Sequence, residues 1–425
     1  MKRNFVLTQK AKDARALGQA AVLAMLGAVS AAANAQTIYG GGATLPAVGY
    51  VGTTADTSSS RLTNPVNDSN SLFANVGSFT VSYCQTGSGT GKKVLGKWNT
   101  FSADNTCPAF SSTPFGFSAP SGQTLPDFAA SDAPLSQTEF SSVVTNASSR
   151  GEPVQFPAVA GAIGILYNNS SLSGTQNLTD AQVCAIFAGS YTNWNQISSS
   201  YASKALTVIY RSDGSGTTFS MSNHLSQVCT LASGHFVTDQ TFTTVDSVLY
   251  PSGLPSNFTG ASGNPGVVTA VGNTDGAIAY GEIADANARV PTPLAHFTVN
   301  SKDPVTDLAS PFTVSTTTGQ VITGANATTG RPTLGAVSGG SHTSSCLYIV
   351  TPDSYANPSG YPIVAVSNLL GYYQGNGSNT TYVQQLLSGP YNSTVQGNTF
   401  DIGSGTGLSF LNIDLTSSIS SCVKS

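Results

Sequence analysis

The segment Arg211-Ser212-Asp213-Gly214-Ser215-Gly216-Thr217 gathers side chains that can bind an oxyanion. It follows the apolar run 206–210 and offers a guanidinium, hydroxyls and consecutive backbone N–H groups. A guanidinium can donate two parallel hydrogen bonds to an oxyanion. Asp213 lies two residues from Arg211 and could fix the orientation of that guanidinium by pairing with it. The alternative is a capped helix that carries a surface arginine.

A second candidate is the glycine-rich segment GGGATLP at 40–46. Glycines allow the backbone to come close to a ligand, and Pro46 suits the first turn of a helix. The N–H groups of such a turn point at an anion. A plain glycine turn after a strand would produce the same pattern.

The segment TGSGTGK at 86–92 invites comparison with a nucleotide P-loop, but its spacing excludes one. The GxxxxGK motif requires glycine where Thr86 stands, and Lys93 follows Lys92 in place of the Ser or Thr that would bind Mg²⁺. A nest of backbone N–H groups for a small anion fits better, with a flexible loop as the alternative. A further segment, SDAPLS at 131–136, contains Asp132, and the residue alone favours a helix cap.

The elements that must position these segments alternate between strand and helix. Apolar runs predict strands at 163–167, 206–210, 277–283 and 362–370, and helical spacing predicts helices opening at Thr179, through 219–225 and at 382–387. Such alternation predicts an α/β fold with mainly parallel sheets. The Ser-, Gly- and Asn-rich loops at 55–75, 100–125 and 300–345 are expected to be surface elaborations.

The first 35 of the 425 residues have the pattern of a secretory signal peptide. Basic residues precede a small-apolar run, and Ala33-Asn34-Ala35 predicts cleavage before Gln36. The alternative is a membrane anchor, although Gly and Ser interrupt the apolar run near the lower length limit. Residues 36–425 contain 11 Lys and Arg (16 minus 5) and 19 Asp and Glu (20 minus 1), a net charge of −8. An acidic chain without a basic run disfavours nucleic-acid binding.

Six cysteines in an exported chain predict disulfides. Fifteen pairings are possible, and we expect the sequential one: Cys84–Cys107, Cys184–Cys229 and Cys346–Cys422. The absence of a CxxC pair and the presence of only four histidines argue against a structural zinc site, and we expect neither a metal nor a cofactor.

Together, these segments resemble the periplasmic phosphate-binding proteins of the high-affinity phosphate ABC transporter, and the DING-type branch among them. The resemblance rests on GGGATLP, GSGTG, SDAPLS and RSDGSGTTF, supported by LTDAQVCAIFAGSYTNWNQI at 178–197, GNPGVVTAV at 263–271, GAIAYGE at 276–282 and YPIVAVSNL at 361–369. It implies a type II periplasmic-binding-protein fold, with a ligand cleft between two lobes joined by two crossovers. Lobe one would comprise 36–162 and 283–425, and lobe two 163–282. The matching bridge in DING-type proteins supports Cys184–Cys229.

The same resemblance implies a role for each site residue. Thr44 and the Leu45 N–H would bind phosphate from the first loop, and Ser88 from the second. Asp132 would accept a proton from the anion. Lobe two would contribute the group Arg211, Ser215, Gly216 and Thr217, with Asp213 holding Arg211.

We therefore expect a periplasmic or secreted monomer, not an enzyme, that binds inorganic phosphate and delivers it to the membrane permease of an ABC transporter. One alternative is a secreted phosphatase with Ser88 or Ser215 as nucleophile. That chemistry needs a base or a metal pair beside the serine, and the histidines lie in no metal-ligand spacing: His224, His235, His296 and His342. Another alternative is an extracellular phosphate scavenger or adhesin.

Overall fold

The computed structural model describes residues 36–53, 62–97, 125–288, 293–342 and 345–425. Within this part, Ile38–Ser425 form one compact unit. The expected signal peptide at 1–35 and the Cys84–Cys107 disulfide lie outside the described residues, the latter because Cys107 falls in the gap 98–124.

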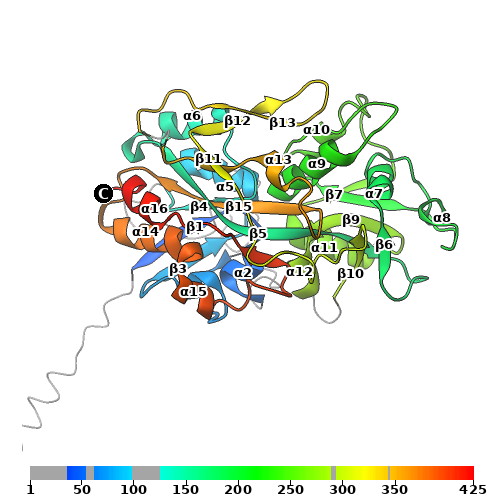
Figure 1. Cartoon of the computed structure of the whole chain (residues 1–425), viewed down its shortest axis with the longest axis horizontal. Helices are drawn as coiled ribbons and strands as arrows, with labels where there is room; N and C mark the ends of the chain where they lie inside the picture. Colours follow the sequence, from blue (N-terminus) through cyan, green and yellow to red (C-terminus); the bar gives the residue numbers. More distant parts are fainter. Residues whose placement is uncertain (1–35, 54–61, 98–124, 289–292, 343–344) are drawn as a thin grey trace, which may run out of the picture. The chain divides into compact units, whose positions relative to one another are not determined.

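A nine-stranded mixed sheet forms the centre of the fold (Figure 1). Its main path runs through β4 (Ala129–Ser131), β15 (Val364–Tyr372), β5 (Pro153–Asn168), β9 (Ala277–Glu282), β7 (Thr207–Arg211) and β8 (Phe258–Ala261). Three short strands attach to it: β16 (Leu408–Phe410) and β10 (Ala295–Val299) pair with β5, and β6 (Gln176–Leu178) pairs with β10.

Strand β5 changes its neighbour halfway along its length. Ala162 is the last β5 residue paired with β15, opposite Val364, and Ile163 is the first paired with β9, opposite Glu282. The change falls where the sequence places the first crossover between lobes. The division into 36–162, 163–282 and 283–425 itself stays a prediction.

The expectation of mainly parallel sheets is wrong. β5 runs antiparallel to both β15 and β9, whereas β7 runs parallel to β8 and β9. Parallel neighbours need a crossover that returns the chain to the same end of the sheet. Two helices carry that return, α9 (Gly216–Val228) after β7 and α11 (Gly263–Asn273) after β8. No such helix joins β5 to its neighbours, because they come from distant parts of the chain.

A smaller sheet brings three loops to the edge of the large one. It consists of β1 (Thr37–Gly41), β3 (Thr80–Cys84) and β2 (Leu62–Thr63). The chain after β1 bridges to β4, with Ala43 N donating to Ala130 O at 2.9 Å. The carboxyl ends of β1, β3 and β4 therefore meet, and α2 (Ala47–Val51), α5 (Ser88–Lys97) and α6 (Gln137–Asn146) follow them.

The remaining helices surround these sheets. α7 (Asp180–Phe187) begins at the predicted capping box, in which Thr179 and Gln182 bond to each other's backbone N–H. The others are α4 (Leu72–Asn75), α8 (Trp194–Ile197), α10 (Phe242–Val245), α12 (Ile283–Ala288), α13 (Pro352–Tyr355), α14 (Thr380–Ser388), α15 (Ser393–Asn398) and α16 (Thr416–Cys422). Among the described residues, no helix is long and apolar enough to cross a membrane.

The loop region 300–345 contains more structure than the sequence suggests. β11 (Thr316–Thr318) pairs with β14 (Tyr348–Val350), and β12 (Gln320–Ala325) forms a hairpin with β13 (Pro332–Ala336). At one end of this hairpin, Ile322 N donates to Leu135 O at 3.0 Å. At its tip, Gly330 O accepts from Thr238 N at 2.8 Å. The hairpin therefore connects the segment that contains Asp132 to the loop after α9 (Figure 1).

Two disulfides tie helices to their surroundings. Cys184 in α7 is bonded to Cys229 at the end of α9, and Cys346 is bonded to Cys422 in α16. These are the two pairs that the sequential scheme expects there. The first fixes the far end of α9, whose other end lies at the candidate site.

Candidate anion-binding site

Arg211 ends β7 and is 2% exposed, which rules out a surface arginine. Its guanidinium is held by Asp213 through two hydrogen bonds, Nε to Oδ1 at 2.8 Å and Nη2 to Oδ2 at 2.6 Å. Asp213 Oδ1 also accepts from Gly263 N, at the start of α11, at 2.8 Å. Asp213 therefore fixes the guanidinium in the way that the resemblance implies.

The Arg211–Asp213 pair is ionised at neutral pH. Burial opposes the charge on Asp213, but the neighbouring guanidinium and the Gly263 N–H outweigh it and lower the carboxyl pKa to about 2. Burial likewise disfavours the charge on Arg211, yet Asp213 raises the guanidinium pKa above its ordinary value. The site thus keeps a charged guanidinium whose charge is balanced by Asp213.

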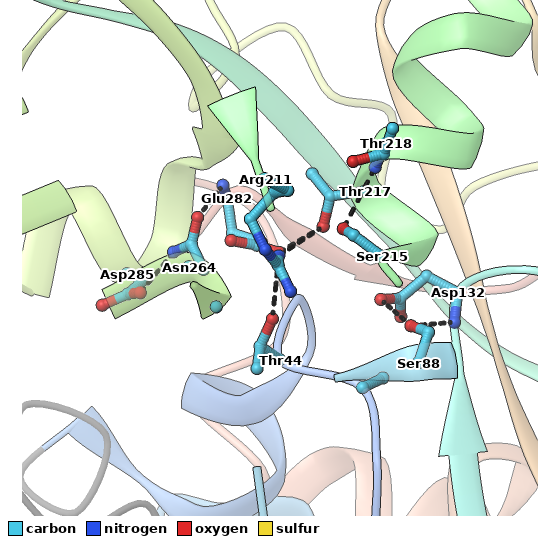
Figure 2. A network of polar contacts seen from close by, with 12 residues as sticks. Thr44, Ser88, Asp132, Arg211, Ser215, Thr217, Thr218, Asn264, Glu282 and Asp285 are labelled. Atoms are coloured by element: carbon cyan, nitrogen blue, oxygen red, sulfur yellow. Dashed lines mark hydrogen bonds and ion pairs between the residues drawn. The ribbon is translucent and has the colours of Figure 1, made fainter. Parts of the chain in front are cut away.

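The remaining guanidinium nitrogen, Nη1, faces three oxygen atoms. Thr44 Oγ1, Thr217 Oγ1 and Glu282 Oε1 each lie 3.4 Å from it (Figure 2). Thr44 and Thr217 are predicted site residues from the two expected lobes, and both are buried. The structure therefore brings both hydroxyls to one guanidinium.

The first turn of α9 connects this group to a second one. Ser215 caps the helix by accepting from Thr218 N at 3.1 Å. Gly216 follows it, and a Cβ atom there would lie 2.5 Å from Asp132 Cβ and 2.6 Å from Ser88 Oγ. Only glycine fits such a close approach. The first N–H groups of a helix lack intrahelical partners and attract anions, so this turn presents backbone donors between the two groups.

The second group is the pair formed by Ser88 and Asp132 (Figure 2). Ser88, the first residue of α5, donates from Oγ to Asp132 Oδ2 at 2.9 Å and accepts from Asp132 N at 3.0 Å. The N–H of the next residue, Gly89, donates to Gly214 O at 3.0 Å. The first turn of α5 and the loop after β7 are thus in direct contact.

Asp132 is buried, and its environment differs from that of a helix cap. The cap of α6 is Ser136, which forms a capping box with Glu139, so the helix-cap interpretation of Asp132 is wrong. Burial raises the Asp132 pKa to about 6, although the hydroxyls of Ser367 and Ser88 and the charges of Arg211 and Lys92 act in the opposite direction. Its Oδ1 atom is buried and makes no hydrogen bond within the described part of the chain.

Lys92, the residue that invites the P-loop comparison, contacts the segment that follows Asp132. Its ammonium lies 2.9 Å from Glu139 Oε2 and 3.1 Å from Pro134 O, and the side chain is buried. Leu45 is also buried, and its side chain packs against Gly161. The contact of the Leu45 backbone N–H with a ligand stays a prediction.

Glu282 lies in the site although no motif in the sequence pointed to it as a site residue. Its Oε1 accepts from Thr44 Oγ1 at 3.3 Å and forms a short contact with Thr217 Oγ1. Burial raises its pKa to about 7, against the opposing charge of Arg211. The place of Glu282 at the end of a strand could have indicated this role, because β9 ends at Glu282 beside parallel β7, which ends at Arg211. Ligand sites gather at the carboxyl ends of parallel strands.

No group of three or more His, Cys, Asp or Glu side chains that could hold a metal ion occurs within the described ranges. The arrangement offers hydrogen-bond donors around one charged guanidinium, together with the carboxyl groups of Asp132 and Glu282, whose oxygens accept hydrogen bonds. Such a set suits an oxyanion that itself carries a proton.

Residues 40–364 match the family model described as a PBP superfamily domain. The chain belongs to the PBP superfamily. The match includes every segment placed in the site above.

Among curated relatives, alkaline phosphatase L of Pseudomonas aeruginosa is 33% identical over 287 residues, which cover 64% of this chain and 66% of that relative. The matched region thus spans just under two thirds of the relative's length. Phosphate-binding protein PstS of Xylella fastidiosa is 32% identical over 168 residues, 38% of this chain and 41% of that relative.

Among solved structures, a phosphate-binding protein from Stenotrophomonas maltophilia has a TM-score of 0.61 and 22% identity, covering 91% of this chain and 93% of that chain. A high-affinity periplasmic phosphate-binding protein solved with phosphate, PfluDING, has a TM-score of 0.59 and 23% identity over 90% and 93%. These similarities establish the periplasmic-binding-protein fold of this PBP superfamily member.

Proposed function

We propose that this chain binds inorganic phosphate in the cell envelope or outside the cell and delivers it to the permease of an ABC transporter. The observation that supports it is one arrangement of side chains. Hydroxyl, guanidinium and helix N-terminal donors lie close to one carboxylate oxygen that has no hydrogen-bond partner among the described residues. The donors come from Thr44, Arg211, Ser215, Gly216 and Thr217, the Ser88 hydroxyl holds Asp132 by donating to Oδ2, and the acceptor is Asp132 Oδ1. One relative in fold was solved with phosphate bound.

In this proposal each group has a defined task. Arg211 supplies the charge, the first turn of α9 supplies N–H donors, and Asp132 accepts a hydrogen bond from the P–OH group of the anion. The protein binds and releases phosphate without turnover. The expected two-lobe hinge would close around the ligand, and the permease would recognise the closed form.

Calorimetry of the purified exported protein with phosphate, sulfate and an aryl phosphate tests this function. We expect tight binding of phosphate alone. Equal binding of sulfate, or no binding of phosphate, would contradict the proposal. Cell fractionation separates a periplasmic carrier from a secreted scavenger or adhesin, because only the former is retained by intact cells.

A second candidate function is phosphomonoester hydrolysis. Two observations favour it: a relative is named alkaline phosphatase L, and Ser88 Oγ lies 2.9 Å from the buried carboxylate of Asp132. A hydroxyl beside a carboxylate whose pKa is raised to about 6 has the layout of a nucleophile and its base. Sustained release of nitrophenol from nitrophenyl phosphate, lost in both Ser88→Ala and Asp132→Asn, would establish it. Activity that survives both substitutions would exclude this pair.

A further inference from the structure

Glu282 uses the same donors that the proposed function assigns to phosphate. Its Oε1 accepts hydrogen bonds from Thr44 Oγ1, at 3.3 Å, and from Thr217 Oγ1, and it lies 3.4 Å from Arg211 Nη1 (Figure 2). A threonine hydroxyl has one hydrogen to donate. While an ionised Glu282 accepts both hydrogens, neither threonine can donate to an anion.

The surroundings of Glu282 hold it in this position. Its backbone N–H donates to Asn264 Oδ1 at 2.9 Å, and the Asn264 amide contacts Asp285 of α12. Residues from five places in the fold therefore face the carboxyl group or its backbone: Thr44 after β1, Arg211 in β7, Thr217 in α9, Asn264 in α11 and Asp285 in α12. The charged ones are Arg211, which favours the carboxylate, and Asp285, which disfavours it.

The second oxygen, Oε2, is buried and makes no hydrogen bond among the described residues. An ionised carboxylate with an unsatisfied buried oxygen is costly. A protonated carboxyl removes that cost and reverses the hydrogen bond, because it donates to a threonine oxygen. The threonine hydrogens can then turn towards a ligand.

We propose that Glu282 is a positioning residue that must be protonated, and so release the hydroxyls of Thr44 and Thr217, when the site binds phosphate. The inference rests on the proposed function. The bound anion adds negative charge beside Glu282, which raises the pKa of this carboxyl further from a ligand-free value of about 7. Phosphate binding at slightly alkaline pH therefore takes up one proton that does not belong to phosphate.

The test is the phosphate affinity of the folded protein between pH 6 and pH 9, compared with Glu282→Gln. Glutamine keeps the shape and donates from its amide in place of the carboxyl proton. Above pH 7 we expect the wild-type affinity to fall more steeply than that of Glu282→Gln, by about tenfold per pH unit for one linked proton. Ionisation of phosphate itself affects both proteins equally and cancels.

Glu282→Asp is the matched control, because it retains a titratable carboxyl group. We expect it to keep the steep pH dependence, and calorimetry in buffers of different ionisation enthalpy should show proton uptake for wild type and Glu282→Asp in excess of that for Glu282→Gln. Parallel pH profiles for wild type and Glu282→Gln would overturn the inference. So would a folded Glu282→Gln that binds no phosphate at any pH.

These outcomes separate this inference from the proposed function. A wild-type protein that binds no phosphate at any pH defeats the function. A wild-type protein that binds phosphate with the same pH profile as Glu282→Gln defeats only the role of Glu282. If Glu282→Gln fails to fold, proton uptake on phosphate binding at pH 8 is measured for Glu282→Asp and wild type instead. The proposal is contradicted if neither protein takes up a proton.

Discussion

Ser88 and Asp132 hold each other through two hydrogen bonds, one from the serine hydroxyl to Oδ2 and one from the aspartate N–H to the serine oxygen. This arrangement fixes the carboxylate plane and leaves Oδ1 without a hydrogen-bond partner among the described residues, which is the position that the proposed function requires of an acceptor. Phosphate near neutral pH carries a proton that can satisfy it, whereas sulfate carries none. A charged acceptor left unsatisfied costs about 1–3 kcal/mol or more.

Asp132→Asn should therefore lose much of the preference for phosphate over sulfate while it retains appreciable affinity for phosphate. The asparagine amide can donate where the carboxylate only accepts. Competition of sulfate against labelled phosphate measures the effect in both proteins. If Asp132→Asn rejects sulfate as strongly as the wild type, another residue discriminates between the two anions.

Arg211→Ala should weaken phosphate binding by about 3–5 kcal/mol, because the anion would lose the guanidinium and Asp213 would be left buried without its cation. Arg211→Lys should also bind less tightly, since lysine cannot reproduce the paired contacts to Asp213. Calorimetry checks both. Unchanged affinity in Arg211→Ala would show that the anion binds elsewhere.

Gly216→Ala should weaken phosphate binding by about 1–3 kcal/mol, a typical cost of overpacking. The added methyl group would lie 2.5 Å from Asp132 Cβ and would push α9 away from Ser88 and Asp132. Gly214→Ala is the control, because a Cβ there meets nothing closer than 3.6 Å. Equal affinities for the two variants would argue against close contact at Gly216.

Asp246 predicts a pH dependence of stability away from the site. It is fully buried, and neither carboxylate oxygen has a hydrogen-bond partner in the described ranges. Burial raises its pKa to about 8. Because the folded pKa exceeds the unfolded one, the folded state binds more protons between about pH 4 and 8, and its stability contribution declines as pH rises through this window. Asp246→Asn should stabilise the protein by about 1–3 kcal/mol at pH 8.

That gain should largely disappear near pH 4, where Asp246 is protonated in the folded state and about half protonated in the unfolded state. Urea unfolding at the two pH values measures the difference. A stabilisation that is equal at both would show that Asp246 does not titrate across this range.

For the cysteines, we expect peptide mapping under non-reducing conditions to find Cys84–Cys107 beside the two disulfides present in the structure. The sequential scheme leaves these two as partners once the other four are paired. A free thiol at either position, or a link to a different chain, would contradict it.

The sequence predicts the local chemistry of the site better than its spatial arrangement. Arg211 and Asp213, and Thr179 and Gln182, interact within a few residues, so spacing alone suffices to pair them. Glu282 was missed because its role depends on the position of β9 beside β7, a neighbour distant in sequence. The antiparallel pairing of β5 was also not predicted, because a buried strand has the same apolar pattern in either direction.

The β12–β13 hairpin stabilises the position of two site segments from outside the site. It is anchored at Leu135, three residues after Asp132, and at Thr238 beyond α9, while Arg331 near its tip donates a hydrogen bond to Ser226 Oγ of that helix at 3.1 Å. These contacts outside the site constrain the separation between Asp132 and α9 a second time. Changes in the length or anchoring of this hairpin can tune affinity while every ligand-facing side chain stays the same.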